Sequence, residues 1–85
     1  MAYQVLLRPA VGRDLAKLPP DIRTRLADVL FALENDPRSH GVTKLAGSHD
    51  VWRVRVGDYR VLFEIDDSAQ TILILRIAHR RDAYR

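Results

Sequence analysis

The second part of the chain takes its positive charge from arginine alone. All seven basic side chains of residues 51–85 are arginines: Arg53, Arg55, Arg60, Arg76, Arg80, Arg81 and Arg85. The planar guanidinium group can bind a phosphate through two parallel hydrogen bonds, and it stays protonated at physiological pH. The cluster therefore favours a phosphate-rich partner, although a basic surface that contacts only water is the commoner outcome of such a pattern.

Two of these arginines are predicted to lie directly opposite each other. The segment "VWRVRVGDYRVLFEI", residues 51–65, alternates on both sides of Gly57-Asp58, and a glycine at the first turn position is typical of a type II′ hairpin. That turn pairs Arg55 with Arg60. Like charges at directly opposed positions destabilise a sheet, so the pair indicates an anion that both side chains share.

The same alternation assigns every strand residue to one side of the sheet. On the hairpin, the predicted core positions are Trp52, Val54, Val56, Tyr59, Val61, Phe63 and Ile65, and the opposite side holds Arg53, Arg55, Arg60, Leu62 and Glu64. On the last strand, residues 71–79, the predicted core positions are Leu73, Leu75 and Ile77. The positions predicted to share the side of the arginines are Ile72, Ile74, Arg76, Ala78 and Arg80. A β-bulge would change these assignments.

The C-terminal segment "HRRDAYR" adds groups suited to RNA chemistry. Histidine has an unperturbed pKa of about 6.5, which suits proton transfer at neutral pH, and Tyr84 can stack on a base or bind a ribose hydroxyl. Arginine clamps, an imidazole and an aromatic ring suffice for metal-free RNA cleavage, in which the 2′-hydroxyl attacks the adjacent phosphate. Against this, a histidine at a strand end is more often a surface or capping residue, and strict alternation points His79 toward the core.

The elements that position these groups are predicted in the order β-α-α-β-β-β. The fold class is α+β, a helical hairpin packed on one face of a mostly antiparallel four-stranded sheet. Residues 36–50 form the one long connection, and such loops are often functional or mobile. The strands are expected at 2–8, 51–56, 59–65 and 71–79, and the helices at 10–18 and 21–35.

Length and composition limit the remaining possibilities. The 85 residues form a single domain, 1–85, with a formal net charge of +3 and no cysteine. The histidines at 40 and 49 show no metal-ligand spacing with His79, so no metal and no cofactor are expected. No apolar run approaches the roughly 18 residues of a membrane span, and no signal-peptide pattern opens the chain. A soluble cytoplasmic protein without membrane contact is expected.

Nearly the whole chain resembles the RelE/ParE superfamily, the toxins of bacterial and archaeal type II toxin–antitoxin systems. The resemblance rests on "DLAKLPP", "KLAG", "VWRVRVGDYRVLFEI" and "ILRIAHRRDAYR". It implies the fold described above. RelE members are ribosome-dependent endoribonucleases that cut mRNA in the decoding A site, so the resemblance also implies a metal-independent mRNA interferase that inhibits translation.

The resemblance further implies a role for each matching residue. Arg60, in "DYR", matches the central arginine that contacts phosphate, Arg80 matches a second catalytic arginine, and Tyr84 matches a tyrosine that positions the nucleotide. His79 stands at a position that is basic in some members, and it acts in proton transfer where that residue is histidine. The residues implied for RNA binding are Lys44, Arg53, Arg55 and Arg81; some relatives have lysines in place of Arg53 and Arg55.

The implied partners are a cognate antitoxin, encoded by an adjacent gene, and the ribosome with its mRNA. Operator DNA is expected to be bound only through the antitoxin. Two alternatives share the fold: a ParE-like inhibitor that binds DNA gyrase without cleaving anything, and a degenerate member that serves as an antitoxin-binding co-repressor. The tail with His79, Arg80 and Tyr84 favours the nuclease, because binding alone needs no group for proton transfer.

Overall fold

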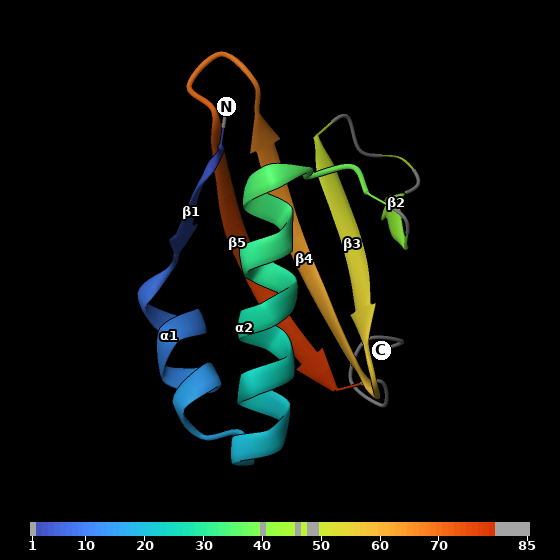
Figure 1. Ribbon diagram of the computed structural model, residues 1–85. Helices are drawn as coiled ribbons and strands as arrows, with labels where there is room; N and C mark the ends of the chain where they lie inside the picture. The colour runs from blue at the N-terminus through green and yellow to red at the C-terminus, as the bar shows by residue number, and fades with distance from the viewer. Residues whose placement is uncertain (1, 40, 46, 48–49, 80–85) are drawn as a thin grey trace.

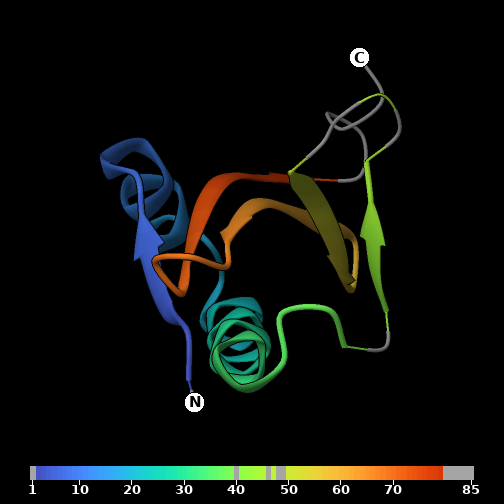
Figure 2. The ribbon, with the colours of Figure 1, turned by 90° about the horizontal axis from the view of Figure 1, so that it is seen from above.

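The computed structural model describes residues 2–39, 41–45, 47 and 50–79, and in this part of the chain two helices pack against one side of a five-stranded sheet (Figures 1 and 2). The strand order is β1-β5-β4-β3-β2; β1 runs parallel to β5 and the other neighbours are antiparallel. The elements are β1 (Gln4–Leu7), α1 (Pro9–Ala16), α2 (Pro20–Asn35), β2 (Val42–Lys44), β3 (Val51–Val56), β4 (Tyr59–Asp66) and β5 (Thr71–His79).

The predicted helical hairpin is confirmed. Each helix begins with a proline, Pro9 or Pro20, at a position where the missing N–H has no partner to lose. The longer helix, α2, crosses the sheet in front of β5 and β4 in Figure 1. Its buried residues meet the inward side chains of the central strands, and the core is built from these layers. The most deeply buried side chains are those of Phe63, Leu26, Leu33, Ile72, Ile74 and Val61.

The α+β class and the mostly antiparallel sheet are confirmed, but the number of strands was predicted wrongly. The fifth strand, β2, lies inside the segment 36–50 and pairs antiparallel with β3. Its three residues are too few for a periodic pattern, and turn-forming residues surround them. The segment predicted as one long connection is therefore two shorter ones on either side of an edge strand.

The predicted hairpin register is confirmed. Arg55 is the partner of Arg60 across the β3–β4 ladder, and Val54 is the partner of Val61. Gly57 has a φ of 59°, whereas Asp58 is not among the described residues with positive φ. A positive φ at the first turn position alone distinguishes a type II′ turn from type I′, which needs it at both. The glycine thus sets the turn that brings the two arginines face to face.

The sides assigned to the first half of β5 were wrong. Leu62 pairs with Arg76, but its neighbour Phe63 pairs with Ile74, so Leu75 is an extra residue in β5. This bulge reverses the alternation before it. Ile72 and Ile74 are therefore in the core, with 0% of their surface exposed, and not beside the arginines. After the bulge the prediction holds, because Ile77 is buried.

The predictions of core positions for Leu73 and Leu75 fail for the same reason. Leu73 pairs with Glu64, which places it on the side of the arginines. Leu75 is the bulged residue itself and is half-buried. Both errors come from one inserted residue, which an apolar run such as "TILILRIAH" conceals because either side of the strand is apolar.

Candidate functional site

Four arginines from three strands lie on the side of the sheet opposite α2. Paired residues of neighbouring strands share a side, and the register gives two rows across the sheet. One row contains Arg55, Arg60 and Ala78; the next contains Thr43, Arg53, Leu62 and Arg76. We call Arg53, Arg55, Arg60 and Arg76 the basic end of this open face, since all four lie toward the β3–β4 turn. The predicted sharing of one face by these arginines is confirmed.

The directly opposed arginines differ in their surroundings. Arg55 is exposed, and its Nε donates a hydrogen bond to the carbonyl oxygen of Gly57 at 3.2 Å. Arg60 lies on the central strand β4, is half-buried, and has its Nε shielded from solvent. Its neighbour on β5 is the small Ala78. The surrounding strands therefore restrict the Arg60 side chain, whereas the Arg55 side chain lies exposed beside the turn.

Three of the four arginines of the basic end have no acidic neighbour among the described residues. Within that part of the chain, no carboxylate oxygen lies within 4.0 Å of the guanidinium groups of Arg53, Arg55 or Arg76. Positive charges that share a surface without counter-charges repel one another and attract anions. The arrangement can therefore bind a polyanion such as the phosphate backbone of a nucleic acid.

A further arginine reaches the same turn from α2. A Cβ atom added at Gly57 would lie 3.3 Å from NH1 of Arg25 and 3.7 Å from its Cζ. The sequence did not predict this contact, because nothing in the spacing of positions 25 and 57 shows that the N-terminal part of α2 lies beside the hairpin. Arg25 extends the positive charge around the turn to the helical side.

Two of the predicted site residues lie on the other side of the sheet. His79 is the partner of Tyr59, and their rings meet edge to face, with centroids 5.1 Å apart at 87°. Lys44 is the partner of Trp52, and its Nζ lies 5.9 Å from the indole centroid. His79 is at the same end of the sheet as Arg60 but faces the helices, as the alternation predicted.

The remaining predicted residues, Arg80, Arg81 and Tyr84, lie outside the described residues.

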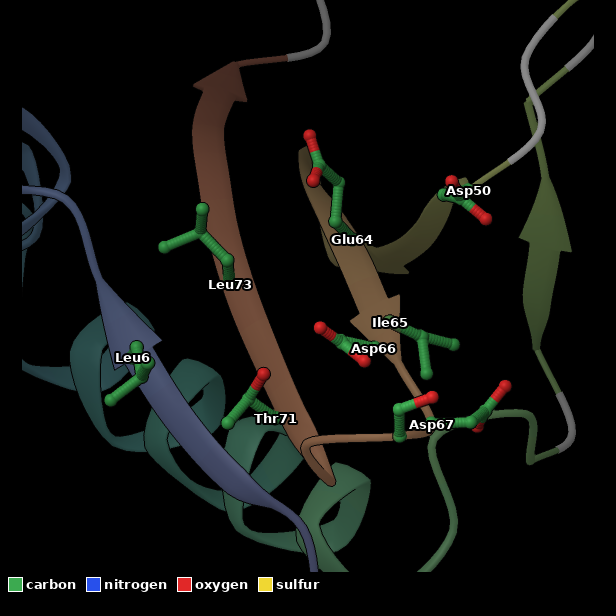
Figure 3. A pocket seen from close by; sticks show the side chains of 9 residues that line it. Leu6, Asp50, Glu64, Ile65, Asp66, Asp67, Thr71 and Leu73 are labelled. Carbon is green, nitrogen blue, oxygen red and sulfur yellow. The ribbon is translucent and has the colours of Figure 1, made fainter.

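The far end of the open face carries the opposite charge. A cavity of about 560 Å³ lies there, and Figure 3 shows Leu73 between Leu6 and Glu64 along its wall. Glu64 follows Leu62 by two residues along β4, so it shares the side of the arginines. We call the lining carboxylates the acidic end: Asp50, Glu64, Asp66 and Asp67.

Two carboxylates of the acidic end are engaged within the protein. Asp67 accepts hydrogen bonds from the Tyr3 hydroxyl at 2.6 Å and from the Arg38 NH1 and NH2 atoms at 3.0 and 2.9 Å. These bonds, above all those from Arg38, lower the pKa of Asp67 to about 2. Asp67 in turn raises the pKa values of Tyr3 and Arg38. The Asp66 Oδ1 atom accepts a hydrogen bond from the Ala69 amide at 3.0 Å.

This network ties together segments that are distant in the sequence. Asp67 lies in the turn between β4 and β5, Tyr3 precedes β1, and Arg38 follows α2. The guanidinium carbon of Arg38 also lies 5.2 Å from the Trp52 ring centroid, within the range of a cation–π interaction. Asp67 thus stabilises the fold, and sequence spacing gives no sign of such long-range contacts.

Comparison with known proteins assigns the chain to a family. The family described as "ParE toxin of type II toxin-antitoxin system, parDE" matches residues 5–84. The chain belongs to the RelE/ParE superfamily of type II toxins. It is similar to the toxin RelG of Mycobacterium tuberculosis, with 39% identity over 89 residues that cover 100% of this chain and 99% of that protein.

Two solved RelE structures share the fold. The RelE–RelB complex from Pyrococcus horikoshii gives a TM-score of 0.85 at 32% identity, covering 94% of this chain and 97% of that one. The toxin–antitoxin complex RelBE2 from Mycobacterium tuberculosis gives 0.82 at 34% identity, covering 94% and 100%. The resemblance inferred from the hairpin and the C-terminal motif is therefore confirmed.

In this RelE/ParE toxin, no helix of the described residues is long and apolar enough to cross a membrane. The same residues contain no group of three or more His, Cys, Asp or Glu side chains arranged to hold a metal ion.

Proposed function

We propose that this toxin is a ribosome-dependent endoribonuclease that cleaves mRNA in the A site and so inhibits translation. In the proposed reaction the ribose 2′-hydroxyl loses its proton and attacks the adjacent phosphate, the bond from phosphorus to the 5′-oxygen of the next nucleotide breaks, and that oxygen takes up a proton; no metal ion takes part. One observation carries the proposal: Arg55 lies directly opposite Arg60 on an open sheet face that Arg53 and Arg76 share. Fixed positive charges stabilise the extra negative charge of the phosphorane transition state.

Arg60 is proposed to bind the phosphate that is attacked. Its central strand and partial burial fix its position before the substrate arrives, and a charge that is shielded from water acts more strongly on its neighbours. Arg55, directly across the ladder, shares the same phosphate. The repulsion between the two side chains in the free protein is then relieved when the anion binds.

His79 is proposed as the proton-transfer group, and Arg80 and Tyr84 as further catalytic residues. Because its ring faces the helices beside Tyr59, the RNA has to pass over the end of β5 to reach both His79 and Arg60. His79→Gln is expected to reduce the cleavage rate about 100-fold, as for loss of a general acid or base. A variant that cleaves like the wild type would assign proton transfer to another residue.

A cognate antitoxin, encoded by an adjacent gene, is the proposed protein partner. The similar toxins from Pyrococcus horikoshii and Mycobacterium tuberculosis were both solved in toxin–antitoxin complexes. Acidic or helical segments of the antitoxin would cover the basic end and offset the charges of Arg53, Arg55 and Arg76, which no acid of the described residues neutralises. Contact with operator DNA would then occur through the antitoxin.

The proposal is tested by mapping mRNA 5′ ends in a purified translation reaction. Wild-type toxin is expected to produce cuts at A-site codons, and Arg60→Ala is expected to produce none. Arg23→Ala is the matched control, because it removes an exposed arginine of α2 on the other side of the sheet. Intact mRNA in the presence of wild-type toxin would overturn the proposal.

Inhibition of DNA gyrase without cleavage is the second candidate, and two observations favour it. The matching family is described by the name of ParE, and His79 lies on the other side of the sheet from Arg60. If mRNA stays intact, a supercoiling assay with purified gyrase tests this second candidate. Inhibition of supercoiling by the wild-type toxin would indicate that the basic end is a surface that binds gyrase.

A further inference from the structure

We propose that the basic end binds two successive phosphates of a single RNA strand, and that Arg76 is a positioning residue for the second one. This inference rests on the proposed function and deepens it. It adds a residue to the site and assigns a direction to the RNA, which would run along β4 from the turn toward Glu64.

The register places Arg76 opposite Arg53 across one intervening strand. Both pair with Leu62, so the row reads Arg53, Leu62, Arg76. Neighbouring strands are about 4.8 Å apart, which separates the two arginine backbones by about 10 Å. Their long side chains flank the half-buried Leu62 from both sides. A phosphate above Leu62 would receive a guanidinium from each.

The row of Arg53 and Arg76 is one step along the sheet from the row of Arg55 and Arg60. The two rows are two residues apart on β4, or about 6.8 Å at 3.4 Å per residue. Successive phosphates of an extended single strand can span this separation. If Arg55 and Arg60 bind the phosphate under attack, the neighbouring phosphate reaches Arg53 and Arg76.

Arg76 is available for this role. Its side chain is exposed, and no carboxylate of the described residues lies within 4.0 Å of its guanidinium. The bulge at Leu75 is what directs it here, because the residue after the bulge returns to the open face while Ile74 stays in the core. A β-bulge commonly re-aims a side chain in this way.

The acidic end limits the site to two phosphates. The next row along β4 contains Glu64, and Asp66 follows two residues later. Both carboxylates repel a third phosphate at the distance of one further step. The reversal of charge along the open face therefore fixes both the length of RNA bound and the direction in which it leaves the site.

The salt dependence of RNA binding tests the inference. The probe is a short 2′-O-methyl oligoribonucleotide, which lacks the attacking hydroxyl, followed by fluorescence anisotropy. Each phosphate bound by a single strand contributes about −0.7 to the slope of log affinity against log salt. The wild type is expected to give about −1.4. The double variant Arg53→Ala/Arg76→Ala is expected to give about −0.7 by the same rule.

Single variants separate the role of Arg76 from an effect on the fold. Arg76→Ala is expected to weaken binding three- to tenfold, Arg76→Lys to keep the slope, and Arg23→Ala to match the wild type. In the translation reaction, Arg76→Ala should raise the toxin concentration for half-maximal cleavage with little change in the maximal rate. Arg60→Ala should lower the maximal rate.

The outcomes for the two proposals are distinct. An Arg76→Ala variant that binds the probe with wild-type affinity and slope would overturn the two-phosphate site, even if wild-type toxin cleaves mRNA. A wild-type toxin that does not bind the probe would overturn it as well. If the slopes change as expected but mRNA stays intact, the two-phosphate site stands and the nuclease proposal fails.

Discussion

The two ends of the open sheet face have opposite charges and use them differently. At the acidic end, Asp67 accepts hydrogen bonds from Tyr3 and Arg38, and Asp66 accepts a hydrogen bond from the backbone amide of Ala69. At the basic end, Arg53 and Arg76 have no acidic partner among the described residues, and Arg55 binds only a backbone carbonyl there. Two carboxylates of the acidic end are thus bound within the fold, whereas three arginines of the basic end have no acidic partner among the described residues.

This difference separates residues that hold the structure from residues that act on a ligand. Ionised groups that bind one another contribute to folding, whereas like charges left together cost stability in the free protein. A protein keeps such a cost where function needs it. We therefore expect loss of the Asp67 carboxylate to change stability, and loss of the Arg60 guanidinium to change activity.

The largest effect is expected from Arg60→Ala. Loss of the proposed phosphate clamp should reduce cleavage at least about 100-fold, as for removal of a group that stabilises transition-state charge. Expression in a bacterium without the antitoxin should then no longer stop growth, while circular dichroism shows a normally folded protein. An unfolded variant would show that Arg60 is needed for folding, and a variant as toxic as the wild type would show that Arg60 is not needed for activity. Either result would contradict the proposed role of Arg60.

Gly57→Ala is expected to destabilise the hairpin of the basic end. A left-handed backbone with φ of 59° costs a non-glycine residue about 1–2 kcal/mol, and the added Cβ would crowd NH1 of Arg25 at 3.3 Å. In a thermal unfolding experiment, Gly57→Ala should therefore unfold at a lower temperature than the wild type. Gly12→Ala in α1 is the control, because its Cβ meets no atom within 4 Å and alanine favours a helix. Equal stability of Gly57→Ala and wild type would refute the strained-turn account.

Asp67→Asn should lower stability at neutral pH and leave RNA cleavage unchanged. The folded pKa of Asp67 is about 2, below its ordinary 3.8, because of the hydrogen bonds from Arg38 and Tyr3. A depressed carboxylate pKa stabilises the fold above the ordinary value, and this contribution is lost as the pH falls through the folded value. The stability difference between wild type and variant should therefore shrink between pH 3.8 and about 2.

Urea unfolding at several pH values measures that difference. A gap between Asp67→Asn and wild type that stays constant down to pH 2 would show that the carboxylate charge has no part in it.

The smallest effect is expected from Arg55→Gln in the free protein. Removing one of two directly opposed charges should raise the free energy of unfolding by roughly a few tenths of a kcal/mol at low salt. The gain should fade as salt screens the repulsion. Urea unfolding at two salt concentrations, with Arg23→Gln as the control, measures it. A loss of stability at low salt would mean that the bond from Arg55 to the Gly57 carbonyl outweighs the repulsion.

The hairpin and the helices were predictable because their signals are local. Gly57-Asp58 and the alternation around it fix the pairing of Arg55 with Arg60, and the helices predicted at 10–18 and 21–35 lie at Pro9–Ala16 and Pro20–Asn35. The side of His79 followed from the same alternation, since the bulge precedes it.

The errors came from features with no periodic signal. Leu75 is a single inserted residue in an apolar run, and β2 has only three residues. The contacts of Asp67 with Tyr3 and Arg38 join positions that are far apart in the sequence. Such contacts depend on how the elements pack, which side-chain spacing within one element does not encode.

The most direct test of the account compares the two ends in one experiment. Wild type, Arg60→Ala and Asp67→Asn are added in equal folded amounts to a purified translation reaction, and mRNA 5′ ends are mapped. We predict A-site cuts with wild type and Asp67→Asn, and none with Arg60→Ala. Cuts that persist with Arg60→Ala would contradict the proposed role of Arg60 in cleavage. Cuts that disappear with a folded Asp67→Asn would contradict the purely structural role of Asp67.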